Sequence, residues 1–218
     1  MKEIENPSWR EFYKETVTFK KFLKRIMCNL ELIFLIIKRM PRSVVEIGTG
    51  TGALSAFISW FLPTVVAIDN DKEVLKNAKN NCKIFGRKIN FVAADAFALP
   101  FKDSVFSLCF SQGFFEHFQD NEIRNLMMEQ LRVSKQIIIF SVPSDKYPVK
   151  PFGNERLLSP SNWHKIILSS LSLKSFRTQV RYCRVDIEAF KYFFTTKKWH
   201  GFFEIIGFLK IIGIEKNK

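Results

Sequence analysis

Val44-Val-Glu-Ile-Gly-Thr-Gly-Thr-Gly52 is the stretch that decides the fold of this 218-residue chain. Four residues typical of a buried strand run directly into alternating glycines, and residues 53–61 then have helical character. A strand that passes through glycines into a helix places backbone N–H groups and the positive end of the helix against a ligand. Side chains at Gly48, Gly50 and Gly52 would forbid the turn or fill the ligand's space. The stretch therefore predicts a ligand-binding loop, with a tight turn that binds nothing as the alternative.

Further strands and helices are expected on the C-terminal side of this loop. Runs rich in β-branched residues predict strands, and helical periodicity fills the segments between them. The expected strands are residues 44–47, 64–68, 89–93, 105–110, 136–142, 173–183 and 207–215. The expected helices are residues 53–61, 71–85, a helix capped by Asp120, and residues 160–171 and 186–206. This alternation predicts an α/β fold with a Rossmann-like, doubly wound, mostly parallel seven-stranded sheet, which binds ligands beyond the carboxyl ends of its strands.

The chain is expected to form one domain of three parts. Residues 8–40 have helical periodicity that ends before Pro41, so we expect an N-terminal helical cap or lid over residues 1–42. Residues 43–145 would form the ligand-binding core. Residues 146–218 would supply a loop beside the binding pocket, over residues 144–158, and the C-terminal strands.

The charge of the chain is unevenly distributed. Its net charge of +13 comes from +5 in residues 1–42, −1 in residues 43–145 and +9 in residues 146–218. We therefore expect something anionic to meet the flanks, whereas flanks that only keep a Phe-rich chain soluble are the alternative. The four cysteines form no metal-binding or disulfide pattern, and no signal peptide or transmembrane run is evident, so we expect a cytoplasmic protein without a metal.

Two carboxylates bear on the identity of the ligand. The loop also satisfies a dinucleotide fingerprint, with Asp69 near the position of a ribose-binding acid. However, Glu46 lies two residues before the first glycine, where a carboxylate favours an ammonium group over a phosphate. Asp95, after the third expected strand, can accept a hydrogen bond from an adenine amino group. A nicotinamide-dependent oxidoreductase leaves Glu46 and Asp95 without a role, but it remains an alternative.

Residues 44–145 resemble class I S-adenosylmethionine-dependent methyltransferases, and the methyltransferase type 11 pattern in particular. The matching stretches are residues 44–52, Val66-Ala-Ile-Asp-Asn-Asp71, Phe91-Val-Ala-Ala-Asp95, Leu99-Pro-Phe101 and Phe110-Ser-Gln-Gly-Phe-Phe-Glu-His-Phe118. Two places depart from the pattern: Ser107 stands where the family has Asp, and residues 133–136 replace a Pro-Gly-Gly turn.

The resemblance implies methyl transfer from S-adenosylmethionine, with S-adenosylhomocysteine as the product. The residues that would bind this cofactor are Glu46, Gly48, Thr49, Gly50, Gly52, Asp69, Asn70, Asp95, Ala96, Ser111 and Gly113. In resembling proteins an N-terminal segment, here with Trp9, Phe12 and Tyr13, folds over the cofactor. An amphipathic helix packed on the sheet is the alternative for that segment.

Candidates for chemistry at the acceptor are fewer. Glu116 and His117 follow the fourth expected strand and would either transfer a proton or serve structure, and Tyr13 is a further candidate. Substrate-facing candidates in the loop after the fifth expected strand are Tyr147, Asn154, Glu155 and Arg156. We expect the acceptor to be anionic or carried on something anionic, such as nucleic acid, with a neutral small molecule as the alternative. A non-catalytic nucleic-acid-binding module on the same fold also remains open.

Overall fold

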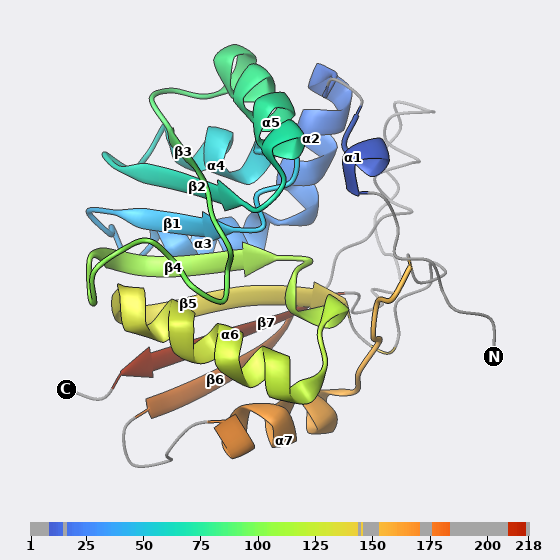
Figure 1. Cartoon of the computed structure of the whole chain (residues 1–218), viewed down its shortest axis with the longest axis vertical. Helices are drawn as coiled ribbons and strands as arrows, with labels where there is room; N and C mark the ends of the chain where they lie inside the picture. Colours follow the sequence, from blue (N-terminus) through green and yellow to red (C-terminus); the bar gives the residue numbers. More distant parts are fainter. Residues whose placement is uncertain are drawn as a thin grey trace, which may run out of the picture.

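One sheet organises the chain (Figure 1). The computed structural model describes residues 9–14, 17–143, 145, 153–170, 176–183 and 209–216. Seven strands lie in the order β3-β2-β1-β4-β5-β7-β6, with β1 to β5 parallel and β7 antiparallel to both of its neighbours. The expected mostly parallel α/β fold is therefore confirmed. The strands are β1 (Val44–Ile47), β2 (Val65–Asp69), β3 (Asn90–Ala93), β4 (Phe106–Gln112), β5 (Ser134–Pro143), β6 (Phe176–Cys183) and β7 (Leu209–Lys216).

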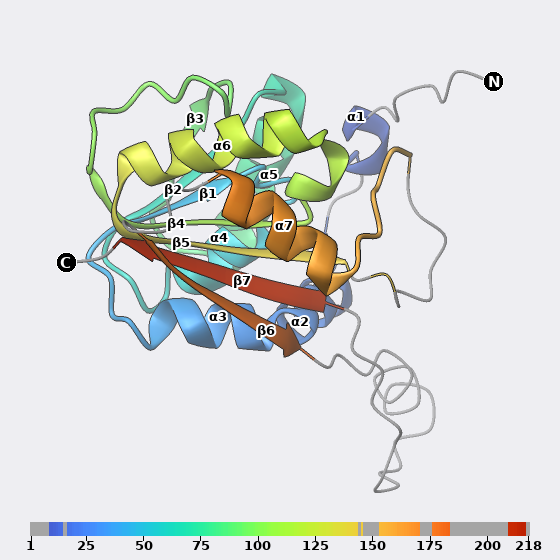
Figure 2. The ribbon, with the colours of Figure 1, turned by 90° about the horizontal axis from the view of Figure 1, so that it is seen from below.

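Helices cover both faces of the sheet, and Figure 2 shows the two layers. The helices are α1 (Trp9–Phe12), α2 (Phe19–Cys28), α3 (Leu30–Ile37), α4 (Ala53–Ile58), α5 (Lys72–Phe85), α6 (Asp120–Val133) and α7 (Pro160–Ser170), with a 3-10 turn, η1, at Phe115–His117. Side chains of α6 and α7 fill one side of the core, and those of α2, α3 and α4 fill the other.

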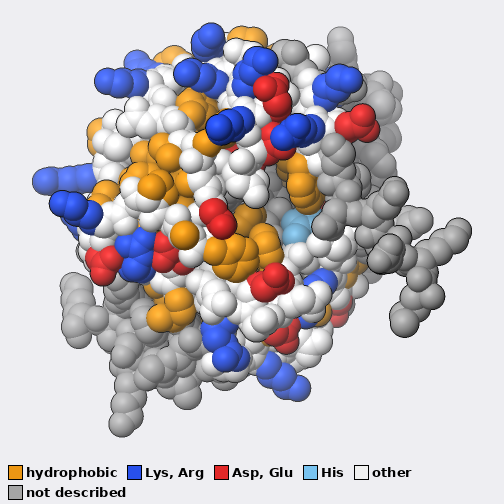
Figure 3. All heavy atoms as spheres, viewed as in Figure 1, with side chains coloured by type: hydrophobic (Ala, Val, Ile, Leu, Met, Phe, Trp, Pro, Cys, Tyr) orange, Lys and Arg blue, Asp and Glu red, His pale blue; other side chains and the backbone are white. Residues whose placement is uncertain are grey.

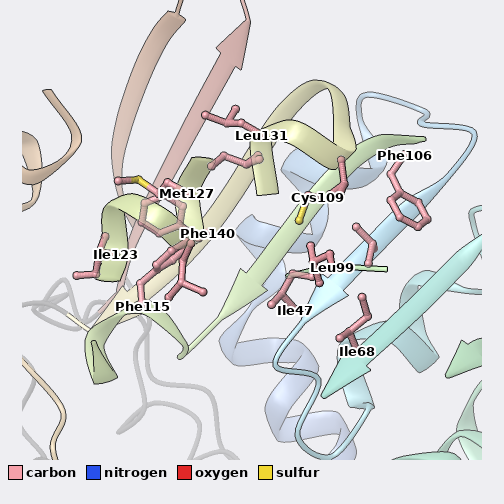
Figure 4. Close-up of a cluster of buried hydrophobic side chains, with 14 of the residues drawn as sticks. Ile47, Ile68, Leu99, Phe106, Cys109, Phe115, Ile123, Met127, Leu131 and Phe140 are labelled. Atoms are coloured by element: carbon pink, nitrogen blue, oxygen red, sulfur yellow. The ribbon is translucent and has the colours of Figure 1, made fainter. Parts of the chain in front are cut away.

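The alternation of side chains along a strand explains the unbroken apolar runs. Ile138 and Phe140 of β5 join the core beside α6 and α7, whereas Ile137 and Ile139 join the core on the opposite face. A strand buried on both faces has no polar face, which is why its sequence shows no period of two. Figure 4 shows the first of these clusters, where Phe115 and Phe140 lie with ring centroids 4.5 Å apart.

The N-terminal cap is divided where the sequence predicted one helical run over residues 8–40. The α2 helix begins after Thr18, whose hydroxyl accepts a hydrogen bond from the backbone N–H of Lys21 at 3.3 Å. At Asn29 the chain leaves helical geometry and α3 begins immediately afterwards. The side-chain amide of Asn29 donates to the carbonyl of Arg25, which satisfies a carbonyl at the end of α2.

The N-cap of α6 differs from the expected residue, whereas the end of α6 runs directly into β5, as residues 133–136 indicated. The N-cap of α6 is Gln119 instead of Asp120, and Gln119 N–H donates to the Glu122 carboxylate at 2.8 Å. No turn separates α6 from β5. The Ser134 hydroxyl donates to the Ile137 carbonyl and accepts from the Ile137 N–H, while the pairing of β4 with β5 shifts register near Phe106. A β-bulge thus takes the place of the family's turn.

The outer parts of the chain are described only in pieces. The predicted helix at 160–171 and strands at 173–183 and 207–215 correspond to α7, β6 and β7. The predicted helix at 186–206 lies outside the described residues. In the described ranges, none of the helices combines the length and apolarity that a membrane crossing requires.

Leu108 tests the central packing. It is fully buried in β4 against α2, α3 and α4, whereas Leu30 is 52% exposed. We expect Leu108→Ala to lower the free energy of unfolding by about 2–5 kcal/mol, because the cavity adds to the lost burial. Urea unfolding measures this, with Leu30→Ala as the matched control. Equal losses in the two variants would show that this face of the sheet is not the core.

Candidate functional site

A buried carboxylate fixes the glycine loop at the end of β1. Glu46 is 3% exposed, and its Oε2 accepts hydrogen bonds from the Thr49 hydroxyl at 2.9 Å and from Ser55 N–H at 3.2 Å. The Ser55 hydroxyl donates to the same oxygen. Burial raises the pKa of Glu46 to about 7, although these hydrogen bonds oppose the shift. The strand, the loop and the first turn of α4 are therefore joined through one oxygen atom.

Gly50 and Gly48 are required by backbone geometry and by space. Gly50 has φ +52°, and a Cβ there would lie 2.8 Å from Cζ of Tyr13. Gly48 has φ +69°, and a Cβ there would lie 2.6 Å from a ring carbon of Phe114. Both values of φ favour glycine. In this structure the loop closely approaches aromatic side chains of the protein.

A cavity of about 520 Å³ opens at the carboxyl ends of the strands, where the fold predicted a ligand. Seven of the predicted cofactor residues line it: Gly48, Gly50, Asp69, Asn70, Asp95, Ala96 and Gly113. Glu46 and Thr49 line a small adjoining cavity of about 20 Å³, together with Arg25 and Gln112.

Gly52 and Ser111 line neither cavity. Gly52 lies against Cys82 and Ala78 of α5, so it allows two helices to approach. Ser111 is fully buried in β4 and its hydroxyl has no hydrogen-bond partner.

Asp69, the last residue of β2, and Asp95, just after β3, present carboxylates to the larger cavity. Asp69 accepts from Gly50 N–H and Asp71 N–H at 3.3 and 3.2 Å, and burial raises its pKa. Asp95 is exposed and accepts from Phe97 N–H at 2.9 Å. The bond from Gly50 to Asp69 ties the glycine loop to the end of β2.

The aromatic N-terminal segment lies over this cavity, as one of the two sequence expectations proposed. Trp9 and Tyr13 are stacked with centroids 5.9 Å apart, and both line the cavity. Arg10 pairs with Asp71 at 2.6 Å, and the Asn77 amide donates to the Tyr13 carbonyl. Burial raises the pKa of Tyr13 to about 12. Phe12, in contrast, is 48% exposed.

His117 and Asn154 form the opposite wall. The Asn154 amide donates to the His117 carbonyl at 2.9 Å, so its oxygen is placed to accept from His117 Nδ1, 3.0 Å away. Nδ1 then carries the proton, and Nε2 is left as an acceptor. Burial lowers the pKa of His117, and the Trp9 ring lies edge-on at 4.8 Å.

Two of the remaining residues that were predicted to face the acceptor do not line the cavity. Arg156 donates to the Phe118 carbonyl and to Asp120, both at 2.6 Å, so it joins the loop to η1 and α6 and does not line the cavity. Glu155 does not line it either. Tyr147 lies outside the described residues.

Glu116 lies beneath the cavity and does not line it. It is 1% exposed, one carboxylate oxygen has no hydrogen-bond partner, and burial raises its pKa to about 8. Of the predicted Glu116–His117 pair, His117 lines the cavity and Glu116 does not, and a role in proton transfer stays a prediction. Glu116, His117 and Glu155 place potential metal-ligand atoms within 4.8 Å of one another. The sequence-based expectation of no metal stays a prediction.

The sequence analysis missed several aromatic and polar wall residues. Phe97, Phe114, Phe118, Gln119 and Glu122 line the cavity. The spacing of Gln119 and Glu122 fits a capping box and could have placed them at a helix start beside the loop. The phenylalanines gave no such signal, because aromatic residues occur throughout this chain.

Comparison with known proteins agrees with this geometry. The family described as "Methyltransferase domain" matches residues 44–136, which include the glycine loop, Asp69 and Asp95. The glycine loop, Asp69 and Asp95 thus lie in a segment that is similar to methyltransferase domains. The demethylmenaquinone methyltransferase of Thermus thermophilus is 31% identical to this chain over 90 residues, and the match spans 40% of this chain and 41% of that protein.

Solved structures share the fold over most of the chain. Magnesium protoporphyrin IX methyltransferase from Synechocystis, solved with bound S-adenosylmethionine, has a TM-score of 0.60 at 14% identity, covering 96% of this chain and 89% of its own. A protein from Pyrococcus horikoshii has a TM-score of 0.65 at 15% identity, covering 95% and 99%. At such identities the likeness shows the shared fold.

The contact between Gly50 and Tyr13 can be tested by the rate at which trypsin cleaves the aromatic segment. We expect Gly50→Ala to displace Tyr13 and to speed trypsin cleavage at Arg10 and Lys14, since a methyl group would overlap the Tyr13 ring. Gly153→Ala is the matched control, because Gly153 also has positive φ, +60°, but lies in an exposed loop. Mass spectrometry of the fragments measures both rates. Equal rates would mean that Tyr13 does not rest on the loop.

The raised pKa of Glu116 predicts a pH dependence of stability. The folded protein holds a proton on Glu116 up to about pH 8, whereas an unfolded Glu loses it near its ordinary value of 4.5. The contribution of Glu116 to the free energy of unfolding is therefore fully present at low pH and is lost as the pH rises through 8. We expect Glu116→Gln to flatten the decline in the free energy of unfolding between pH 6 and 9.

Glu129→Gln is the control for this experiment, because the ion pair with Arg132 lowers the pKa of Glu129, so its titration lies below this window. Urea unfolding at each pH gives the comparison. A slope in Glu116→Gln as steep as in the native chain would contradict a titrating buried acid.

Proposed function

We propose that this protein transfers a methyl group from S-adenosylmethionine to an acceptor bound in the same cavity. The proposal depends on the charge of the site. Glu46, Asp69 and Asp95 lie at the carboxyl ends of β1, β2 and β3. The described residues that line the larger cavity include no Lys or Arg. A pyrophosphate would bring negative charge against these carboxylates. A ligand that carries a sulfonium and an ammonium group fits them instead.

The small inner cavity suits the amino-acid end of such a ligand. Glu46 supplies a carboxylate for an ammonium group, and Arg25 supplies a cation for a carboxylate. In this arrangement Asp69 accepts from ribose hydroxyls, while Asp95 and Ala96 N–H contact the adenine edge. The Glu46 pKa of about 7 would fall when an ammonium group binds beside it.

S-adenosylmethionine supplies an electrophilic methyl group, so the protein contributes mainly position and protection from water. Trp9 and Tyr13 close the cavity from above, and Gly113 leaves room under the proposed methyl position. His117 is neutral at neutral pH, and its Nε2 is the group we propose to receive a proton when the acceptor carries one.

The acceptor end of the cavity favours a flat and largely apolar group. Its walls include Trp9, Phe118 and His117, with the Asn154 amide as a polar contact. Aromatic walls bind planar groups through stacked and edge-to-face contacts. The name of the Thermus relative, a demethylmenaquinone methyltransferase, is in keeping with such an acceptor. None of the described residues in this wall is a cation that would pair with an anionic acceptor. We therefore propose that the predicted anionic contact lies on the outer surface.

The division into cap, core and C-terminal part remains our proposal for the whole chain. So does the cytoplasmic location, with which the free thiols of Cys28, Cys82 and Cys109 are compatible. A nicotinamide-dependent oxidoreductase and a non-catalytic nucleic-acid-binding module gain no support from the cavity.

Calorimetry with the purified protein tests the proposed function. We expect S-adenosylmethionine and S-adenosylhomocysteine to bind and NADH not to bind. Asp69→Ala should weaken binding by about 1.5–3 kcal/mol, the usual value of hydrogen bonds to a charged group. Asp103→Ala is the matched control, because Asp103 is exposed and pairs with Arg132 away from the cavity. Binding of NADH without binding of S-adenosylmethionine would overturn the proposal.

A further inference from the structure

Exposed apolar side chains gather where α2 begins and where α4 and α5 end. Phe19 is 67% exposed, Trp60 53%, Phe61 49% and Ile84 63%. Phe85 connects them: its ring lies 6.4 Å from that of Phe19, and its carbonyl accepts from Trp60 Nε1 at 2.8 Å. We call Phe19, Trp60, Phe61 and Ile84 the apolar end. Single exposed apolar residues are ordinary, but a group of four large ones marks an interaction surface.

Positive charges predominate around the apolar end. Residues 17–30, 53–68 and 74–94 contain nine Lys or Arg residues and no Asp or Glu, and Glu73 near the start of α5 pairs with Lys76 at 3.4 Å. Lys76, Lys79 and Lys83 recur at helical spacing and share one face of α5. Figure 3 shows Lys and Arg side chains outnumbering Asp and Glu side chains around α5, with hydrophobic side chains nearby. The eight exposed cations are Lys20, Lys21, Lys24, Lys76, Lys79, Lys83, Arg87 and Lys88.

We propose that the apolar end docks on an anionic lipid bilayer. Apolar side chains enter the boundary between headgroups and acyl chains, while surrounding Lys and Arg side chains meet lipid phosphates. Long cationic side chains suit this position, because their stems lie along apolar groups while their heads stay in water. Docking on an anionic bilayer explains both halves of the surface, because this excess of exposed cations is self-repelling and an anionic surface relieves that repulsion.

The contacts within the apolar end favour a bilayer over single-stranded nucleic acid. Bases bind by stacking on free aromatic faces. The guanidinium of Arg87 lies 4.6 Å from the centre of the Trp60 ring, so one face of that ring is already covered. Ile84 has no aromatic face, and the indole N–H of Trp60 is satisfied by Phe85. Phe19 and Phe61 each lie beside a second ring, that of Phe85 at 6.4 Å and that of Phe57 at 5.3 Å between centroids, and their exposed edges can insert into lipid.

The proposed docking surface is separate from the cavity. Asp69, Asn70 and Val74 line the cavity near the start of α5, whereas Ile84 and Phe85 lie at its other end. A 14-residue helix is about 21 Å long. Docking would therefore hold the protein at a membrane with the cavity about that far from the lipid, and it does not depend on the proposed methyl transfer.

Co-sedimentation of the full chain with lipid vesicles tests this proposal. Vesicles of phosphatidylcholine with about one third phosphatidylglycerol should bind the protein at low salt and release it at high salt, and pure phosphatidylcholine should bind it weakly. We expect the triple variant Lys79→Glu, Lys83→Glu and Arg87→Glu to bind at least about a hundredfold more weakly, because attraction adds over the cluster. The double variant Phe19→Ser and Ile84→Ser should lose about tenfold while remaining sensitive to salt.

The control variant changes the same net charge elsewhere, with Lys102→Glu, Lys135→Glu and Lys165→Glu, all at exposed positions. Its affinity should stay within about fivefold of the native chain, and circular dichroism should show that all variants fold. Equal losses in the two charge variants would overturn the proposal, as would no binding to anionic vesicles at low salt. Tighter binding to polyuridylate than to vesicles, unaffected by Phe19→Ser and Ile84→Ser, would also overturn it in favour of nucleic acid.

Discussion

The Glu46 carboxylate is the contact on which the site depends. A buried acid is costly unless it is hydrogen-bonded, and here one oxygen takes donors from the Thr49 and Ser55 side chains and from the backbone at the start of α4. These hydrogen bonds therefore fix the path of the backbone from β1 into α4. Positions 48 and 50 on this path require glycine. Their φ values are positive, and close neighbours leave no room for a side chain.

The rest of the cavity is built outward from this loop. Gly50 N–H bonds Asp69, so the end of β2 is held against the end of β1. Tyr13 lies against Gly50, and Arg10 pairs with Asp71 after β2, so the same two strand ends also hold the aromatic segment. The cavity thus combines carboxylates with aromatic walls, which is the chemistry on which the proposed cofactor and acceptor depend.

The sequence predicted the parts of this arrangement that depend on local pattern. The glycine loop and the acids after β2 and β3 follow from short motifs, and the apolar runs of β1, β2 and β5 could be recognised as buried strands. Hydrophobic periodicity did not reveal the rest. The break at Asn29 and the bulge at Ser134 involve local hydrogen bonds between side chain and backbone, and the burial of Glu116 depends on packing in the folded chain. The apolar end and its cations could not be predicted from the sequence either, because α2, α4 and α5 supply them from separate segments.

A crystal structure of the protein with S-adenosylhomocysteine tests the central claim most directly. The account predicts ligand density in the larger cavity, with both ribose hydroxyls within hydrogen-bonding distance of Asp69 and the amino-acid end between Glu46 and Arg25. Tyr13 should remain over the ligand and the loop. A ligand bound elsewhere, or one whose ribose contacts neither oxygen of Asp69, would contradict the account.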